Sequence, residues 1–375
     1  MRNALCITIA LAALAAAATA TAGGGYFSDL DTPVAQPGQE IFLHWDAKSS
    51  METLVVSPEF QADKPAEHFG IVIPTPHKPE VSAAPESMFG DLLAWTALQP
   101  KKCRKRRPRV KRGDPPLPKP DPPYIAPQVT ILASGTVGAV EWKTLRAQDA
   151  AALYDWLKTN KYNFAADEET LESYVRRYWV FTVVKASTSK APLDKSGRQH
   201  GRVAPVQLKF RTQTPIVPLA PIRGSAPGGL DTLFYIAAPH RMSVGGGEVE
   251  YARKVARADV KRIGAGPIEL PRSAWDTASR THDFKALGPY LGSGMYLTKI
   301  RRRFDTAALT GELQVARDKT NKEYFTFEDC GIEQGTAAPT APVKKKPAVV
   351  KETPKKAKKG KADKAKAAAA ETKEG

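Results

Sequence analysis

The alternation of apolar and polar residues predicts two helices and then two strands in residues 149–218. The first helical segment, DAAALYDWLKTNKYNF, begins at Asp149, and its apolar face consists of Leu153, Trp156 and Leu157. The second, DEETLESYVRRYW, has the same spacing, with an apolar stripe of Leu171, Tyr174, Val175 and Tyr178. It places acidic residues in its first turn and Arg176 and Arg177 in its last, the order that a helix dipole favours. WVFTVVKAS and VQLKFRT follow as strands, which we expect to pair with each other.

Strand patterns dominate the rest of the chain. Apolar runs bounded by Pro, Gly, Asp or Ser predict strands in EIFLHWD, METLVVSPEF and HFGIVIPTP. Further strands are predicted in PQVTILASGTVGAVEWKTL, LDTLFYIAAP and NKEYFTFED, and GMYLTKIRRRF is apolar at Met295, Leu297 and Ile300. PESMFGDLLAWTAL predicts a helix, DTAALTGEL a short helix, and GEVEYARKV either a strand or a short helix. We therefore predict an α+β body of mainly antiparallel sheets with three or four packed helices.

The first 22 residues have the features of an export signal. Arg2 precedes the apolar run LCITIALAALAAAA, and Ala20-Thr21-Ala22 stands before Gly23, which predicts cleavage after Ala22. Retention of the run as an uncleaved membrane anchor is the alternative. No later stretch of the sequence approaches the ~20 apolar residues that span a bilayer. We expect an exported protein without a transmembrane helix after signal removal, located in the periplasm, at the envelope or outside the cell.

Apart from the single charge of Arg2, the formal net charge of +17 comes from two segments of the chain. Residues 101–123 hold ten Lys or Arg against two Asp, and residues 337–375 hold twelve Lys against four acidic residues, so each segment carries +8. The remaining body is neutral. We predict a folded body over 23–332, with two subdomains at 23–190 and 203–332 as one way of dividing it. An exposed Pro-rich basic insert covers 99–123, and a disordered basic tail covers 333–375.

These basic segments are the candidate binding sites for anionic polymer or lipid headgroups of the envelope. The candidate residues are Arg104, Lys105, Arg106, Arg107, Arg109, Lys111, Arg112, Lys355, Lys356, Lys358, Lys359 and Lys361. Neither segment interleaves aromatic residues for base stacking, so specific nucleic-acid binding is not expected. A solvated charge run that binds nothing in particular is the alternative.

Motifs for catalysis, metals and cofactors do not emerge from the sequence, and we predict no catalytic residue, metal ligand or cofactor. His68 and His77 flank GIVIPTP and could meet at one rim, but two histidines at strand ends are the simpler account. Residues 187–190 match S-x-x-K by chance, because they follow a strand. The glycines at 245–247 fit a turn between strands better than a phosphate loop. Cys103 and Cys330 either form a disulfide or remain thiols.

The order of the segments resembles a known bacterial family. GGGYF, EIFLHWD, HFGIVIPTP, EVSAAPESMFGDLLAWT, DAAALYDWLKTNKYNF, YVRRYWVFTVVKAS, PVQLKFRTQTPIVPL and YLTKIRRRFDTAALTGEL match, in order, the exported family catalogued as domain of unknown function 2330. The resemblance extends from Gly23 to about Asp329. It implies an exported cell-envelope or secreted protein and implies no activity. Family members often have Cys where this chain has Gly23, and many carry a cysteine-rich insert where this one is basic.

From these observations we expect a non-enzymatic binding or structural protein of the cell envelope, tethered to anionic surfaces by its basic segments. The alternative is a hydrolase of envelope material, whose site would be assembled from residues distant in sequence. The sequence predicts neither a ligand nor an oligomeric state.

Overall fold

A computed structural model gives the fold of residues 26–28, 34–66, 68–97, 99–100, 129–137, 140–160, 162–164, 168–188, 191–269, 281–325 and 327–328. The chain divides into two units, residues 1–330 and 331–375, and all described residues lie in the first unit. The predicted signal, residues 101–123 of the basic insert and the tail lie outside the described residues. No helix in the described part of the chain is long and apolar enough to cross a membrane.

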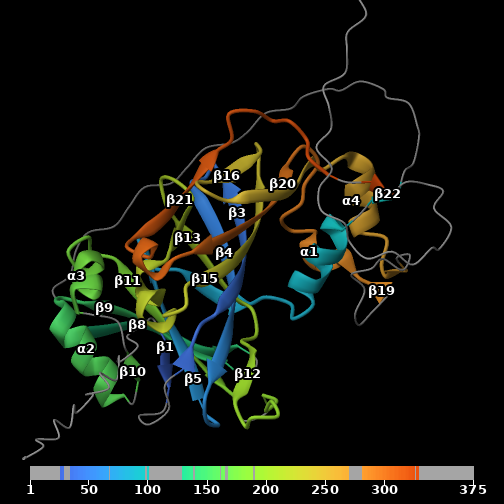
Figure 1. The fold of residues 1–375 in the computed structure, drawn as a ribbon. Coiled ribbons are helices and arrows are strands. Elements are labelled where there is room, and N and C mark those ends of the chain that lie inside the picture. The colour runs from blue at the N-terminus through green and yellow to red at the C-terminus, as the bar shows by residue number, and fades with distance from the viewer. Residues whose placement is uncertain are drawn as a thin grey trace, which may run out of the picture. The chain divides into compact units, whose positions relative to one another are not determined.

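A nine-stranded sheet is the largest element of the fold (Figure 1). Its main path runs β17-β20-β15-β3-β4-β13-β6, while β12 and β2 each pair with β4. The strands are β2 (Val34–Ala35), β3 (Gly38–Asp46), β4 (Met51–Ala62), β6 (Glu80–Ala83), β12 (Gln199–Arg202), β13 (Val206–Arg211), β15 (Leu230–Ala238), β17 (Glu248–Lys254) and β20 (Tyr296–Phe304). All pairs are antiparallel except β15 with β3. The sheet thus combines strands from before and after residues 191–203.

A six-stranded antiparallel sheet is the second layer, in the order β10-β1-β5-β11-β9-β8. Its strands are β1 (Tyr26–Ser28), β5 (His68–Thr75), β8 (Val129–Val137), β9 (Val140–Ala147), β10 (Asn163–Phe164) and β11 (Val180–Ser187). Smaller sheets pair β14 (Ile216–Pro218) and β16 (Met242–Val244) with β21 (Glu312–Arg317), β18 (Ile268–Glu269) with β19 (Thr281–His282), and β7 (Gln99–Pro100) with β22 (Phe327–Glu328). The prediction of mainly antiparallel sheets is confirmed.

Apolar side chains fill the space between the two large sheets. The alternate residues Ile41 and Leu43 of β3 point into this core, where they share a cluster with Ile71 and Ile73 of β5. On the opposite face of β3, Phe42 belongs to a second cluster with the helix α1 (Met88–Thr96). β3 is therefore apolar on both faces at its centre, because each face is covered. This explains why its sequence lacks a clean alternation.

Helices cover the outer face of each large sheet (Figure 1). The helices α2 (Ala150–Thr159) and α3 (Glu168–Val175) pack on the six-stranded sheet, while α1, α4 (Arg257–Ile263) and the 3₁₀ turn η2 (Phe284–Leu287) pack on the nine-stranded sheet. Asp149 caps α2 by accepting a hydrogen bond from the Ala152 amide at 2.6 Å. The predicted helices at α1, α2 and α3 are confirmed, whereas α4 follows a segment for which we predicted only a strand or short helix.

Two predictions about α3 are wrong at its C-terminal end. The helix ends at Val175, so Arg176 and Arg177 follow it and do not form its last turn. Tyr178, predicted on the apolar stripe, lies in the turn after the helix with a φ of 60° and is 83% exposed. Once the chain leaves the helix, the fourth position of the stripe no longer faces the sheet.

Two strand predictions also need correction. β11 and β13 do not pair: β11 lies between β5 and β9, whereas β13 lies between β4 and β6 in the other sheet. The helix predicted in DTAALTGEL is limited to the 3₁₀ turn η3 (Thr306–Ala308), and the chain enters β21 at Glu312. Gly311 precedes that strand, and its backbone carbonyl accepts hydrogen bonds from Leu219 and Ala220. These contacts with a distant segment favour an extended chain here.

Candidate functional site

The residues predicted to bind anionic surfaces all lie outside the described residues, as do Cys103 and Cys330. The predicted tethering and the disulfide therefore stay predictions. A functional site within the described part of the chain must come from side chains that the fold brings together.

The histidines considered in the sequence lie apart. His68 begins β5 and His77 follows the end of that strand, so the length of β5 separates them. The Nδ1 atom of His77 lies 2.9 Å from the carbonyl oxygen of Arg211. A third histidine, His200, lies on β12 and is exposed. Among the described residues, no group of three or more His, Cys, Asp or Glu side chains is placed to hold a metal ion.

His282 forms an ion-pair contact that the sequence did not indicate. Its Nδ1 atom lies 3.2 Å from Oδ1 of Asp91, which is 2% exposed on α1. Burial raises the pKa of Asp91, against the hydrogen bonds from Ser87 and His282, which lower it. Ser87 acts on this carboxylate, and the imidazole contact that the described residues provide is with Asp91, so the three residues lack the order of a nucleophile, base and orienting acid.

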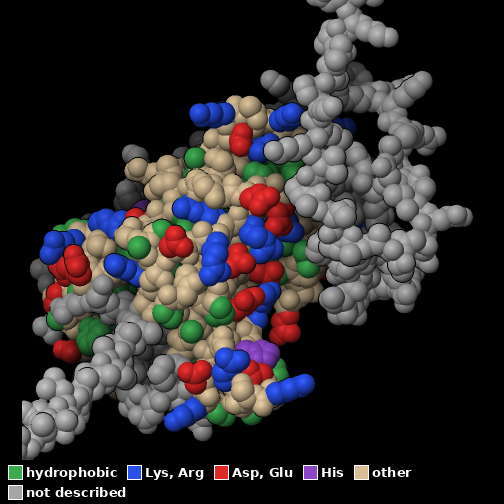
Figure 2. All heavy atoms as spheres, viewed as in Figure 1, with side chains coloured by type: hydrophobic (Ala, Val, Ile, Leu, Met, Phe, Trp, Pro, Cys, Tyr) green, Lys and Arg blue, Asp and Glu red, His purple; other side chains and the backbone are tan. Residues whose placement is uncertain are grey.

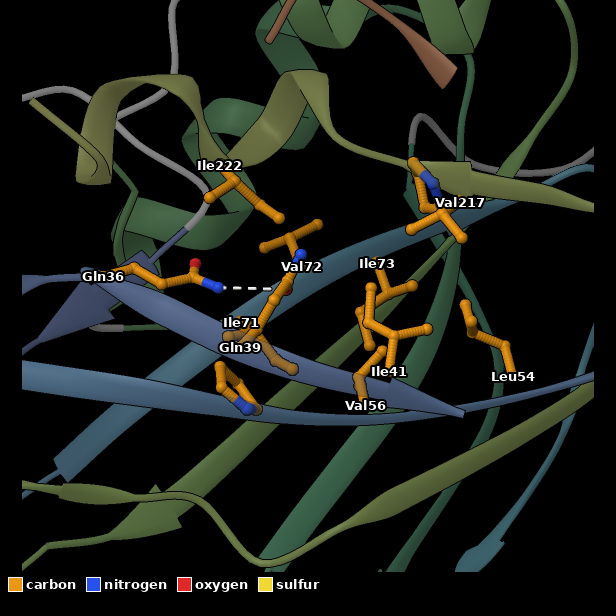
Figure 3. Close-up of a pocket in the computed structure, with 12 residues that line it drawn as sticks. Gln36, Gln39, Ile41, Leu54, Val56, Ile71, Val72, Ile73, Val217 and Ile222 are labelled. Atoms are coloured by element: carbon orange, nitrogen blue, oxygen red, sulfur yellow. Dashed lines mark hydrogen bonds between the residues drawn. The ribbon is translucent and has the colours of Figure 1, made fainter. Parts of the chain in front are cut away.

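A small cavity lies between the two sheets, and it has a volume of about 30 Å³ (Figure 3). Aliphatic side chains of β3, β4 and β5 form most of its wall. The Nε2 group of Gln36 donates to Oε1 of Gln39 at 3.1 Å, while Oε1 of Gln36 has no hydrogen-bond partner among the described residues. A space of this size matches one water molecule. It is too small to be the site of a larger ligand.

The candidate functional site is a larger surface groove, of about 400 Å³, beside helix α1. This α1 groove is lined by Glu40, Ser57, Glu86, Phe89, Gly90, Leu93, Arg202, Val203, Ala204 and Pro205. α1 forms one wall, Glu40 of β3 and Ser57 of β4 contribute the floor, and the end of β12 with its link to β13 forms the other wall. The Ser57 hydroxyl donates to the carbonyl of Val203 at 2.8 Å, which fixes the link against β4. The volume falls in the range typical of ligand sites.

Arg202 is the central charge of the groove, and two carboxylates hold it. Its Nη1 atom is paired with Glu40 on β3 and its Nη2 atom with Glu59 on β4. Burial raises the pKa of Glu40, although Arg202 opposes this shift. The guanidinium is therefore already neutralised by its neighbours and is poorly suited to capture an anionic ligand.

The pairing of charges continues across the nine-stranded sheet beyond the groove. Arg301 on β20 contacts Glu250 at 2.8 Å and Asp231 at 3.2 Å, while Lys299 contacts Glu250 at 2.8 Å. Glu250 is partly buried, but hydrogen bonds from Lys299 and Arg301 lower its pKa. Acidic and basic side chains are interspersed over one face of the molecule (Figure 2). The body thus has no net charge in the sequence count, and on this surface its acidic and basic side chains also neutralise one another locally.

Sequence reasoning missed the groove, because its charged partners come from distant segments. Glu40 and Arg202 are 162 residues apart, and no strand was predicted at the position of β12. The available signal was a glutamate within the strongly apolar strand EIFLHWD, since a charged residue in such a strand needs a partner.

Fold and site together define a β-rich protein of two large sheets flanked by helices, with an amphipathic groove whose lining contains neither histidine nor cysteine. The chain belongs to the bacterial family described as an uncharacterized protein conserved in bacteria (DUF2330), whose model matches residues 17–316. The family resemblance inferred from the sequence is confirmed.

Comparison with other known proteins adds little. None of the curated proteins matches the sequence. Among solved structures, the crystal structure of baculovirus P35 is 10% identical, with the match covering 80% of this chain and 98% of that chain at a TM-score of 0.27. A similarity at this level carries no argument about function.

Proposed function

We propose that this protein is an exported, non-enzymatic binding protein of the bacterial cell envelope, held to anionic surfaces by its two basic segments. The observation that carries the proposal is the distribution of charge. The segments 101–123 and 337–375 each carry +8, whereas the body is neutral overall and pairs arginines such as Arg202 and Arg301 with carboxylates. Attraction to an anionic surface therefore comes from the segments and leaves the body available for a ligand.

The α1 groove supports a binding role over a catalytic one. Its lining includes one hydroxyl, that of Ser57, which donates to a backbone carbonyl and has no histidine beside it in the groove. Its two charged floor residues, Glu40 and Arg202, neutralise each other. Such a site offers shape, apolar contact and charge, but no activated nucleophile.

Vesicle sedimentation tests the tether directly. The purified chain and a version ending at Gly335 are mixed with vesicles of phosphatidylglycerol and phosphatidylcholine, or of phosphatidylcholine alone, over a range of salt concentrations. We expect the intact chain to sediment with the anionic vesicles and to be released by salt, with the shortened chain released at lower salt. Competition with DNA and with an anionic polysaccharide then separates lipid from polymer binding. Equal behaviour of the two chains would contradict the tether.

A hydrolase of envelope material is the second candidate, and the contact between Asp91 and His282 is the observation that favours it. A buried carboxylate that orients an imidazole is a common arrangement in general base catalysis. The test is hydrolysis of peptidoglycan and of model esters by the wild type and by His282→Gln. Activity that is lost in the variant while its melting temperature is retained would support this candidate.

A further inference from the structure

The α1 groove has one acidic side and one apolar side. The carboxylates of Glu40 and Glu86 line it, and Glu59 shares the guanidinium of Arg202 with Glu40, so three carboxylates and one guanidinium lie in or beside the groove. Glu86 precedes α1 at the exposed rim and has no ion-pair partner among the described residues. A cation in the groove would therefore gain attraction from Glu86, whereas an anion would compete with the carboxylates for Arg202.

The apolar side is formed by α1. Phe89 and Leu93 are four positions apart on the helix. Phe89 is buried in the core cluster beneath α1, so Leu93 provides the accessible apolar surface. Leu93 is 43% exposed, an unusual position for a leucine beside a charged floor. Gly90 lies on the same wall, and a Cβ atom built on it would meet no atom within 4 Å. The wall is therefore open to an incoming side chain at its centre.

We propose that the α1 groove binds a short segment of a partner polypeptide, in which an arginine or lysine stands next to a large apolar side chain. The basic group pairs with Glu86 at the rim and with the excess carboxylate beside Arg202. The apolar side chain packs over Gly90 against Leu93, at the edge of the core that contains Phe89. A volume of about 400 Å³ accommodates a few side chains and not a folded domain. This interaction is separate from the tether, which involves neither α1 nor the nine-stranded sheet.

Fluorescence anisotropy with three labelled pentapeptides tests the ligand class on the purified full chain. The first has an arginine between two leucines, the second has citrulline in place of arginine, and the third has glycines in place of the leucines. Citrulline keeps the size of arginine without its charge. We expect the first peptide to bind about tenfold more tightly than either of the others, since each loses one of the two interactions. Absence of saturable binding, or equal binding of the citrulline peptide, would overturn the proposal.

Substitutions in the groove locate the binding. Gly90→Trp should fill the groove and weaken binding of the arginine peptide by about tenfold or more. Glu248→Lys is the control, because it reverses a charge at an exposed position on β17 outside the groove lining and should leave the affinity within about twofold. Glu86→Lys, at the exposed rim, provides an independent test if the tryptophan variant fails to fold. Unchanged affinity in both Gly90→Trp and Glu86→Lys would place the peptide elsewhere and overturn the proposal.

Discussion

At the scale of single residues, Glu52 is the clearest departure from the rule that charged side chains stay at the surface. It lies on β4, fully buried, and its Oε2 atom accepts a hydrogen bond from the Ile216 amide at 3.0 Å. Its Oε1 atom has no hydrogen-bond partner among the described residues. Burial raises its pKa well above the ordinary value of 4.5. The folded protein therefore favours the protonated, neutral form of this side chain.

The folded-state pKa of Glu52 is raised, so the protonated side chain contributes its full stabilisation below pH 4.5. This stabilisation is lost as pH rises through the folded-state pKa. Glu52→Gln keeps an acceptor for Ile216 and cannot ionise. We expect the variant to gain stability over the wild type as pH rises from 4.5 to 8, by about 1.4 kcal/mol for each unit of pKa shift. Urea unfolding at several pH values measures this difference, with Glu80→Gln as an exposed control. A difference independent of pH would contradict the assignment.

The three glycines at 245–247 form the turn between β16 and β17, as the sequence predicted. They are not equivalent. A Cβ atom on Gly247 would lie 2.5 Å from Cγ2 of Ile300 and 3.0 Å from the carbonyl oxygen of Val244, whereas one on Gly245 would meet nothing within 4 Å. Packing against Ile300 of β20 therefore explains why position 247 is a glycine, without any role in ligand binding.

We expect Gly247→Ala to lower the free energy of unfolding by about 1–3 kcal/mol, because the added methyl group overlaps a core side chain. Gly245→Ala should change it by less than about 0.5 kcal/mol. Chemical denaturation of the two variants provides the measurement. Similar losses in both would show that the contact with Ile300 is not the cause.

At the scale of elements, Arg177 connects α3 to a strand 135 residues further along the chain. Its two terminal nitrogens contact the carboxylate of Glu312 on β21 at 2.9 and 2.6 Å. Its guanidinium also lies 4.8 Å from the ring centre of Tyr174 and 4.6 Å from that of Trp179. The neighbouring Arg176, directly after the end of α3, contacts Glu172 four residues earlier and is more exposed.

A double-mutant cycle on Arg177 and Glu312 should give a coupling energy of about 1 kcal/mol, because the pair is bidentate and partly shielded from solvent. The same cycle on Arg176 and Glu172 should give about 0.3–0.5 kcal/mol, the value for an exposed helical pair. Denaturant unfolding of the single and double variants measures both. A coupling at Arg177 no larger than at Arg176 would contradict its role in joining α3 to β21.

Single helices and strands were predictable from the sequence where one periodicity of apolar residues ran through the whole segment. The periodicity of Leu153 and Leu157 and the cap at Asp149 gave α2, and alternation gave β13 through Leu208 and Phe210. The partners of each strand were not predictable, because they depend on contacts far apart in sequence. β3 pairs in parallel with β15 almost 200 residues later, and neighbouring strands such as β11 and β13 enter different sheets.

At the scale of the whole molecule, the distribution of charge was readable from the sequence and the groove was not. Counting charged residues placed the excess in two segments and left the body neutral. The pairing of Glu40, Glu59 and Arg202 required the register of β3, β4 and β12, which no local pattern contains. The candidate site therefore depends on how distant strands pair, whereas the proposed tether depends only on the amino-acid composition of two segments.

Fractionation of the producing cell tests the tether most directly, with the intact chain compared against a version ending at Gly335. The account predicts that the intact protein sediments with the envelope and is released by high salt, and that the version without the tail, which keeps the basic insert, is released at lower salt. If both forms are soluble outside the cytoplasm, electrostatic tethering by the basic tail is wrong, and the function of the protein must be sought in its neutral body alone.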